Sequence, residues 1–212
     1  MKTVRIVFSK TGRAKYIAHL DLTRAMTRVV RRAGIPLWYT EGFNRHPYLT
    51  FAAPLSLGYE SVGETMDLRL EEDMSYEELV RRLNEALPEG LQAISAAEAV
   101  SKPGELAAGT WRLSFDCPPA PIEALLAQPE ILVEKRTKKK TMKTVDIRPA
   151  FAGAQVEADG EGTVVTVTLP CSSAETVNPG LFLTALNAAS NAAYRCKTLR
   201  LELLKADGTL FR

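Results

Sequence analysis

The amino-acid sequence predicts an α+β protein made of two consecutive units. Segments that alternate apolar and polar residues, as strands do, are interleaved with segments whose apolar residues recur every three or four positions, as in helices. The order strand, helix, strand, strand, helix, strand occurs twice, before and after residues 101–109. That order is typical of the ferredoxin-like pattern. We therefore expect tandem ferredoxin-like units at 1–100 and 110–212, joined by a linker at 101–109.

In the first unit, "VRIVFSK" places Val4, Ile6 and Phe8 on one face and predicts the first strand. The helix that follows has Asp21 as its expected N-cap and ends before Gly34. Three further strands are expected at 36–40, 64–72 and 91–100. A second helix is expected at 74–87, and it begins with the capping-box pair Ser75 and Glu78.

The second unit repeats this order with an insertion. Its expected strands and helices are a strand at 110–117, a helix at 121–128, a hairpin at 155–169 with its turn near Asp159, a helix capped by Asn178, and a last strand at 194–204. Two further strand-like arms flank the "KKK" tip of a basic hairpin at 131–148. We expect this hairpin to be inserted between the first helix of the unit and the strands that follow.

The net charge of +2 conceals two basic regions. Residues 1–50 hold ten Lys/Arg and two Asp/Glu, and residues 131–148 hold seven and two, whereas residues 51–100 hold three and eleven. A locally basic region favours a polyanionic partner, and it also occurs as a solvated face.

The first predicted helix carries the sharpest of these basic patterns. Arg24, Arg28 and Arg31 fall at i, i+4 and i+7, opposite the apolar stripe. Guanidinium groups crowded in this way are relieved by phosphates, which they bind through two hydrogen bonds. The alternative is that acidic residues of 51–100 neutralise them within the fold. Just upstream, a cationic loop precedes the helix and adds Lys10, Arg13, Lys15 and Tyr16.

The stretch "TEGFNRHPYLTFAAP", residues 40–54, mixes aromatic and cationic groups in a loop. Rings that alternate with cations suit unstacked RNA bases and their phosphates. Its candidate contacts are Phe43, Asn44, Arg45, His46 and Tyr48. We expect this loop to lie near the start of the first helix and to bring His46 towards His19, Lys15 and Tyr16.

His19 and His46 are the two histidines of the chain. They are candidates for structural hydrogen bonds, for ligand binding, or for a catalytic acid–base pair. The sequence holds no C-x-x-C pair, no close three-cysteine cluster and no phosphate-binding glycine loop, so we expect no metal and no cofactor. No apolar run approaches the about 18 residues that a membrane span needs, and we expect a cytoplasmic protein without membrane contact.

Three motifs resemble a known family. "KYIAHLD" at Lys15–Asp21, "RRAG" at Arg31–Gly34 and "GFN-HP" across Gly42–Pro47 look like the N-terminal signature of the bacterial radical-SAM-linked family of unknown function. Its members occur as separate chains or as C-terminal extensions of radical SAM proteins. The resemblance implies a radical SAM enzyme as partner.

Together these features favour a non-catalytic RNA-binding or substrate-presenting module that works beside a radical SAM RNA-modifying enzyme, with tRNA or rRNA as partner. One alternative is a metal-independent endoribonuclease of RAMP-like fold that uses His19 and His46. The other is a protein-docking module for the radical SAM enzyme. The expected RNA contacts are the cations and aromatics of 10–31 and 43–48 named above, together with Lys138, Lys139 and Lys140 at the hairpin tip.

Overall fold

The structure is a computed structural model that describes residues 2–43, 45–136, 141–160 and 162–212. The chain divides into two compact units. The first comprises residues 1–106 and 200–212, and the second comprises residues 107–199. Each unit is described by itself below.

The first unit contains two α-helices and the strands that they cover. In chain order its elements are β1 (Lys2–Lys10), the 3-10 helix η1 (Gly12–Tyr16), α1 (His19–Arg32), β2 (Leu49–Phe51), β3 (Glu60–Leu70), α2 (Tyr76–Ala86), β4 (Leu91–Glu98) and η2 (Pro103–Glu105). The strand β10 (Cys196–Lys205) contributes its residues from Arg200 onward.

The second unit contains the other two α-helices of the described residues. Its elements are β5 (Leu106–Phe115), α3 (Pro119–Leu126), β6 (Leu132–Arg136), β7 (Met142–Asp146), η3 (Pro149–Phe151), β8 (Gln155–Asp159), β9 (Gly162–Pro170) and α4 (Gly180–Ser190), followed by the start of β10.

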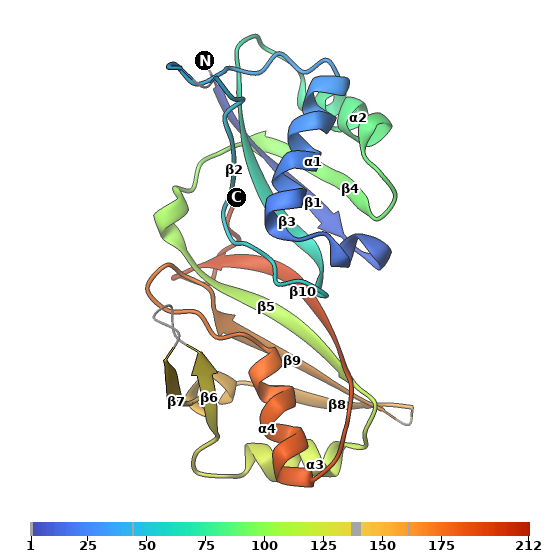
Figure 1. The fold of residues 1–212 in the computed structure, drawn as a ribbon, viewed down its shortest axis with the longest axis vertical. Helices are drawn as coiled ribbons and strands as arrows, with labels where there is room; N and C mark the ends of the chain where they lie inside the picture. Colours follow the sequence, from blue (N-terminus) through green and yellow to red (C-terminus); the bar gives the residue numbers. More distant parts are fainter. Residues whose placement is uncertain (1, 44, 137–140, 161) are drawn as a thin grey trace. The chain divides into compact units, whose positions relative to one another are not determined.

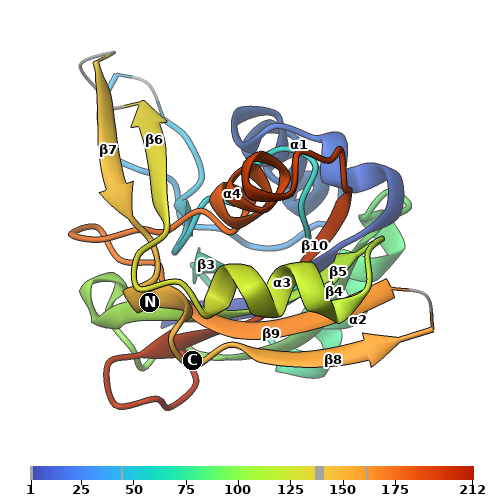
Figure 2. The ribbon, with the colours of Figure 1, turned by 90° about the horizontal axis from the view of Figure 1, so that it is seen from below.

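The protein is thus a mixed α+β protein with mostly antiparallel strands (Figure 1). Among the described residues, the hydrogen-bonded order is β4-β1-β3-β10 in the first unit, where β2 also pairs with β3, and β10-β5-β9-β8 in the second. In the first unit β1 lies antiparallel between β3 and β4. In the second unit β9 lies antiparallel between β5 and β8, and β6 and β7 form a separate two-stranded ribbon (Figure 2).

The core of the first unit lies between α1, α2 and one face of its strands. Val4, Ile6 and Phe8 of β1 pack with Met26 of α1 and Leu79 of α2 in one buried cluster. The helices therefore cover the face that carries the even-numbered residues of β1. Figure 1 shows α1 and α2 next to each other in front of these strands. Burial of these apolar side chains is what fixes the helices on the sheet.

The second strand of the first unit differs from the prediction. Residues 36–40 were expected to form it, yet they supply only the isolated bridges of Leu37 with Leu70 and of Tyr39 with Pro47. The regular pairing with β3 is made by Leu49–Phe51 instead, opposite Met66 to Leu68. Residues 36–40 and Leu49–Phe51 both pair with β3. Their apolar patterns alone therefore do not show which segment forms the regular strand.

The first helix also begins earlier than predicted. α1 starts at His19 after Ala18, and Asp21 lies in the first turn rather than at the N-cap. A carboxylate in the first turn still faces the positive end of the helix dipole. For α2 the N-cap is confirmed, because Ser75 Oγ accepts a hydrogen bond from the Glu78 N–H at 3.2 Å.

The junction of the two units is shorter than the expected linker. Leu106 is buried and opens β5, and Ala108 pairs with Pro170, so residues 106–109 are strand rather than linker.

At the start of α4 the side-chain amide oxygen of Asn178 accepts a hydrogen bond from the Gly180 N–H at 2.9 Å. The Asn178 side chain therefore binds the first N–H of α4, although the N-cap position is Pro179 and the helix begins at Gly180.

Candidate nucleic-acid interface

The exposed face of α1 is a row of three arginines. Arg24, Arg28 and Arg31 are all exposed, and their spacing puts them on one side of the helix. Arg24 pairs with Asp21 at 3.1 Å, and the Arg31 guanidinium lies 5.8 Å from the centre of the Tyr39 ring. Within the described part of the chain Arg28 has no ion-pair partner. Arg24 therefore has an acidic partner on its own helix, whereas Arg28 and Arg31 keep their charge uncompensated by carboxylates.

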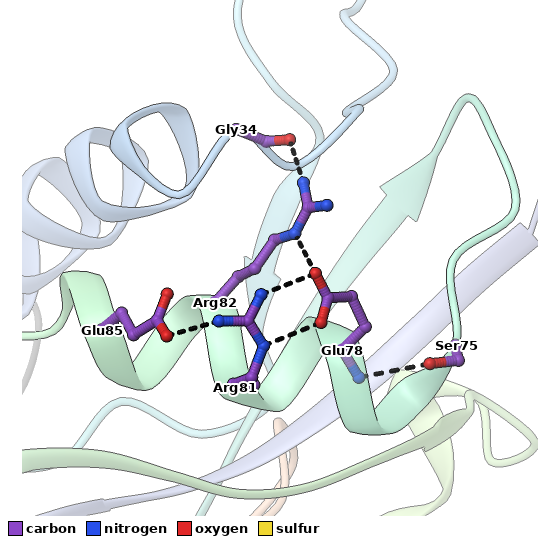
Figure 3. Close-up of polar contacts among 6 residues, drawn as sticks. All are labelled: Gly34, Ser75, Glu78, Arg81, Arg82 and Glu85. Carbon is purple, nitrogen blue, oxygen red and sulfur yellow. Dashed lines mark hydrogen bonds and ion pairs between the residues drawn. The ribbon is translucent and has the colours of Figure 1, made fainter.

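Glu78 and Glu85 of α2 do not neutralise this row, because they bind arginines of their own helix (Figure 3). Glu78 accepts from Arg81 at 2.8 Å and from Arg82 at 2.6 Å, and Glu85 accepts from Arg81. These hydrogen bonds, first from Arg81 and then from Arg82, lower the pKa of Glu78 to about 2. These two carboxylates of α2 are thus already paired.

The fourth arginine of α1 has a structural contact. Arg32 donates a hydrogen bond to the carbonyl of Ala86, at the end of α2. In return Arg82 of α2 donates to the carbonyl of Gly34, just after α1, at 3.2 Å (Figure 3). These two bonds satisfy carbonyl groups at the helix ends and fasten α1 to α2. The arginine row is therefore held on a fixed helix.

The turn before α1 continues the cationic surface. Arg13 and Tyr16 are exposed, with 67% of Tyr16 accessible. Lys15 is half-buried, lies 3.6 Å from Glu60 and is 5.5 Å from the centre of the Tyr16 ring. The Gly58 N–H donates to the Lys15 carbonyl at 2.9 Å, which ties this turn to the loop that precedes β3.

Lys10 does not belong to this surface, which corrects its predicted role. Its side chain is only 1% exposed, and Nζ donates to the Lys15 carbonyl at 3.1 Å. Burial lowers the pKa of the Lys10 ammonium, although the charge of Glu64 acts in the opposite direction. Lys10 continues the face of Val4, Ile6 and Phe8, so strand alternation already placed it inward.

Beneath the turn lies a buried ion pair that the sequence did not reveal. Arg200 donates to Glu64 through Nε at 2.8 Å and Nη2 at 2.6 Å, and to the Ala53 carbonyl at 2.9 Å. Both side chains are almost fully buried. The sequence signal for this pair was a charged residue at the end of an otherwise apolar strand face, where Glu64 precedes Met66 and Leu68.

The loop after α1 has a rigid base. The Thr40 N–H donates to the His46 carbonyl at 2.9 Å, the His46 N–H donates to Thr40 Oγ1 at 3.2 Å, and that oxygen also lies 3.1 Å from His46 Nδ1. Tyr39 and Pro47 form a bridge next to this pair. The loop tip therefore projects from a closed ring of hydrogen bonds. Phe43 on the tip is fully exposed, and Arg45 is exposed as well.

The two histidines have different surroundings. His19 opens α1, and its ring packs edge-on against Phe51 at 5.4 Å. His46 is bonded to Thr40, whose neighbour Tyr39 lies against Arg31 in the last turn of α1. His19 and Arg31 are about 18 Å apart along the helix. The expected approach of His46 to His19 is therefore corrected: Phe51, at the far end of the stretch, is what reaches the start of α1.

Tyr48 is engaged within the fold. Arg69 of β3 lies between two rings, 4.3 Å from the centre of Tyr48 and 4.8 Å from that of Trp38. Tyr48 therefore has a structural partner and is half-buried. Asn44, Lys138, Lys139 and Lys140 lie outside the described residues.

The described residues also show what the chain does not present. In them, no three or more His, Cys, Asp or Glu side chains gather in a way that could hold a metal ion. None of the helices among them combines the length and the apolar composition that crossing a membrane requires.

The fold and this surface define an α+β protein whose first unit exposes a cationic and aromatic face. The chain belongs to an uncharacterised bacterial family, because the family model described as "Uncharacterized protein conserved in bacteria (DUF2344)" matches residues 3–179. None of the curated proteins matches the chain.

Proposed function

We propose that the protein is a non-catalytic RNA-binding module whose contact surface is α1 with the segments at its two ends. The observation that carries the proposal is the exposed row of Arg24, Arg28 and Arg31, in which Arg28 and Arg31 have no carboxylate partner among the described residues. Exposed guanidinium groups without acidic partners, held on a fixed helix, attract a polyanion.

The dimensions of the surface fit a strand of nucleic acid. The 14 residues of α1 extend over about 20 Å, which covers several consecutive phosphates. Tyr16 lies before the start of the helix and Phe43 on the loop after its end, and both rings are exposed. Exposed rings at the ends of a cationic track suit stacking on unpaired bases. The proposed partner is therefore RNA with single-stranded nucleotides, in a tRNA or an rRNA.

The geometry favours binding over cleavage. Metal-independent RNA cleavage by two histidines needs both rings within reach of one phosphodiester. His19 and His46 contact Phe51 and Thr40 respectively, near opposite ends of α1. We therefore assign the histidines to packing and to holding the loop.

We further infer that each unit is ferredoxin-like. In the first unit the order β4-β1-β3 with β2 on β3, and in the second the order β10-β5-β9-β8, are those of a split β-α-β arrangement. The β6–β7 ribbon is then the inserted basic hairpin.

We also propose a radical SAM RNA-modifying enzyme as the partner to which the module presents RNA. Its support is the resemblance carried by residues 15–47. Affinity capture of the tagged chain from its native cells, with both bound RNAs and bound proteins identified, tests this partner. Capture of RNA without any radical SAM enzyme would remove the partner and leave RNA binding in place.

The test of RNA binding is a salt titration with a fluorescein-labelled single-stranded RNA and a labelled hairpin of equal length. We expect the double variant Arg28→Glu/Arg31→Glu to bind at least about tenfold more weakly. The slope of log K against log salt should fall by about 1.4, since each phosphate contact to a single strand contributes about 0.7.

The matched control is Arg112→Glu/Arg195→Glu, which makes the same charge change at two exposed arginines of the second unit. It should keep most of the affinity. If the two double variants lose affinity equally, RNA binding depends on the net charge of the protein and not on the arginines of α1. Unchanged affinity in folded Arg28→Glu/Arg31→Glu would overturn the proposal in favour of protein docking.

A further inference from the structure

A cavity of about 220 Å³ lies on the sheet face of the first unit that α1 and α2 leave uncovered. Its floor is a row across three strands. Val7 of β1 is paired with Thr65 of β3 on one side and with Ser95 of β4 on the other. Directly paired residues point to the same side of a sheet, so these three side chains form one continuous surface.

The wall of the cavity depends on a glycine. A Cβ atom on Gly63 would lie 2.4 Å from the carbonyl oxygen of Leu201, which is too close for any side chain. Gly63 therefore allows β10 to approach β3 at this point. The residues that follow β10, Leu210 and Phe211, close the other side. The cavity is thus formed by segments far apart in the sequence that meet in one unit.

Thr65 brings an unpaired polar atom to this cavity. The residue is 4% exposed, and its Oγ1 atom has no hydrogen-bond partner in the described part of the chain. A buried hydroxyl without a partner is unfavourable. A molecule that enters the cavity and pairs with this hydroxyl relieves that cost.

Part of the rim of the cavity is apolar and exposed. Val62, Ile94 and Leu210 line it and are 39%, 49% and 37% accessible to solvent. Two side chains of opposite charge, Glu202 and Arg212, also line the cavity and leave it without net charge. Arg5, on the same face of the sheet, is held by Asp67 through bonds of 2.7 and 2.8 Å and is covered by the Phe211 ring. Its charge is therefore compensated within the fold.

We propose that this cavity binds a small, uncharged molecule of one aromatic ring's size, with a single hydrogen-bonding group that pairs with Thr65. The volume is smaller than the ~300–1,000 Å³ of typical drug-sized sites, which limits the ligand to about one ring. The apolar rim contacts the body of the ligand, and the Thr65 hydroxyl contacts its polar group. This site is separate from the arginine row of α1, because α1 covers the opposite face of the strands.

The experiment uses the full chain with labelled Val, Leu, Ile and Thr methyl groups, titrated with phenol and with toluene and observed by NMR. We expect saturable shifts for both probes, confined to methyls such as those of Val7, Val62 and Leu210. Thr65→Val keeps the shape of the side chain and removes the hydroxyl. It should weaken phenol binding about fivefold and leave toluene binding unchanged.

Two further variants make the result unambiguous. Thr50→Val, at an exposed position of β2, should change neither affinity. Ser95→Phe fills the floor of the cavity and should abolish binding of both probes. Shifts that grow linearly without saturation would overturn the proposal. So would equal phenol affinity in the wild type and Thr65→Val, since water would then be the partner of the hydroxyl.

Discussion

Arg200 holds the carboxylate of Glu64 through two nitrogen atoms, at 2.8 Å from Nε and 2.6 Å from Nη2, although the residues are 136 positions apart. A third bond runs from Arg200 to the carbonyl of Ala53. The pair therefore connects β10, β3 and the loop before β3 within the first unit. This loop in turn binds the Lys15 carbonyl through Gly58, so the ion pair supports the turn that precedes α1.

Removal of Arg200 is expected to destabilise the protein severely. Arg200→Met leaves the Glu64 carboxylate buried without its partner, and we expect a loss of about 3–5 kcal/mol in the free energy of unfolding, measured by urea denaturation. Arg195→Met, at an exposed arginine of the second unit, is the control and should change stability by less than about 0.5 kcal/mol. Adding Glu64→Gln to Arg200→Met should recover part of the loss. A cost below about 1 kcal/mol for Arg200→Met would contradict this account.

Lys10 is expected to make the stability of the protein depend on alkaline pH. Burial lowers its pKa below the ordinary value of 10.5, so the unfolded chain binds more protons between the folded pKa and 10.5. The cost of burying the ammonium is therefore present at neutral pH and is lost as pH rises towards 10.5.

Lys10→Met removes the buried ammonium and so tests this directly. The Lys15 carbonyl still accepts the hydrogen bond from the Gly58 N–H in this variant. We expect the variant to be at least as stable as the wild type at pH 7. Its advantage should shrink as the pH is raised, in denaturation curves measured side by side. An advantage that grows with pH would show that Lys10 stabilises the fold through its charge.

Glu78 is expected to titrate near pH 2. The hydrogen bonds from Arg81 and Arg82 lower its pKa from 4.5 to about 2, so its stabilising contribution is present above pH 4.5 and is lost as the pH falls to about 2. Carbon-detected NMR of the carboxyl group measures this pKa. Arg81→Gln should raise it, whereas Lys102→Gln, an exposed cation elsewhere in the unit, should not. A Glu78 pKa near 4.5 in the wild type would exclude the paired geometry of Figure 3 in solution.

Phe43 is expected to contribute to RNA binding and not to folding. Its side chain is fully exposed, so Phe43→Ala should change the free energy of unfolding by less than about 0.5 kcal/mol. Loss of one stacked base costs about 1–3 kcal/mol, which weakens single-stranded RNA binding by roughly 5- to 150-fold in fluorescence anisotropy. Val100→Ala, at another exposed apolar residue, should leave the affinity unchanged. Equal affinities of wild type and Phe43→Ala would place the contact away from this loop.

Local patterns in the sequence determined much of the secondary structure. Alternation identified β1 and β3, the three-to-four residue period identified α1 and α2, and the turn at Asp159 and Gly160 identified the β8–β9 hairpin. These features depend on neighbours in the chain, which a sequence displays directly. The arginine spacing on α1 was also local and holds in the structure.

The tertiary structure decided which of these residues are available to a ligand. Lys10 looked like a surface cation until the fold buried it under the turn before α1, and Tyr48 looked free until Arg69 was found against its ring. Leu49–Phe51, and not residues 36–40, pairs regularly with β3. Hydrogen bonding to a distant strand selects the paired segment, and local alternation does not.

The sequence by itself determined the periodicities, the caps and the charge of each segment, because each of these arises between residues close in the chain. Tertiary structure alone decided the pairing of Arg200 with Glu64 and the cavity that Thr65 lines. Both require strands from the two ends of the chain to meet. The pairing of these strands is stabilised by burial of apolar surface and by hydrogen bonds between residues more than a hundred positions apart. No local pattern in the sequence encodes such contacts.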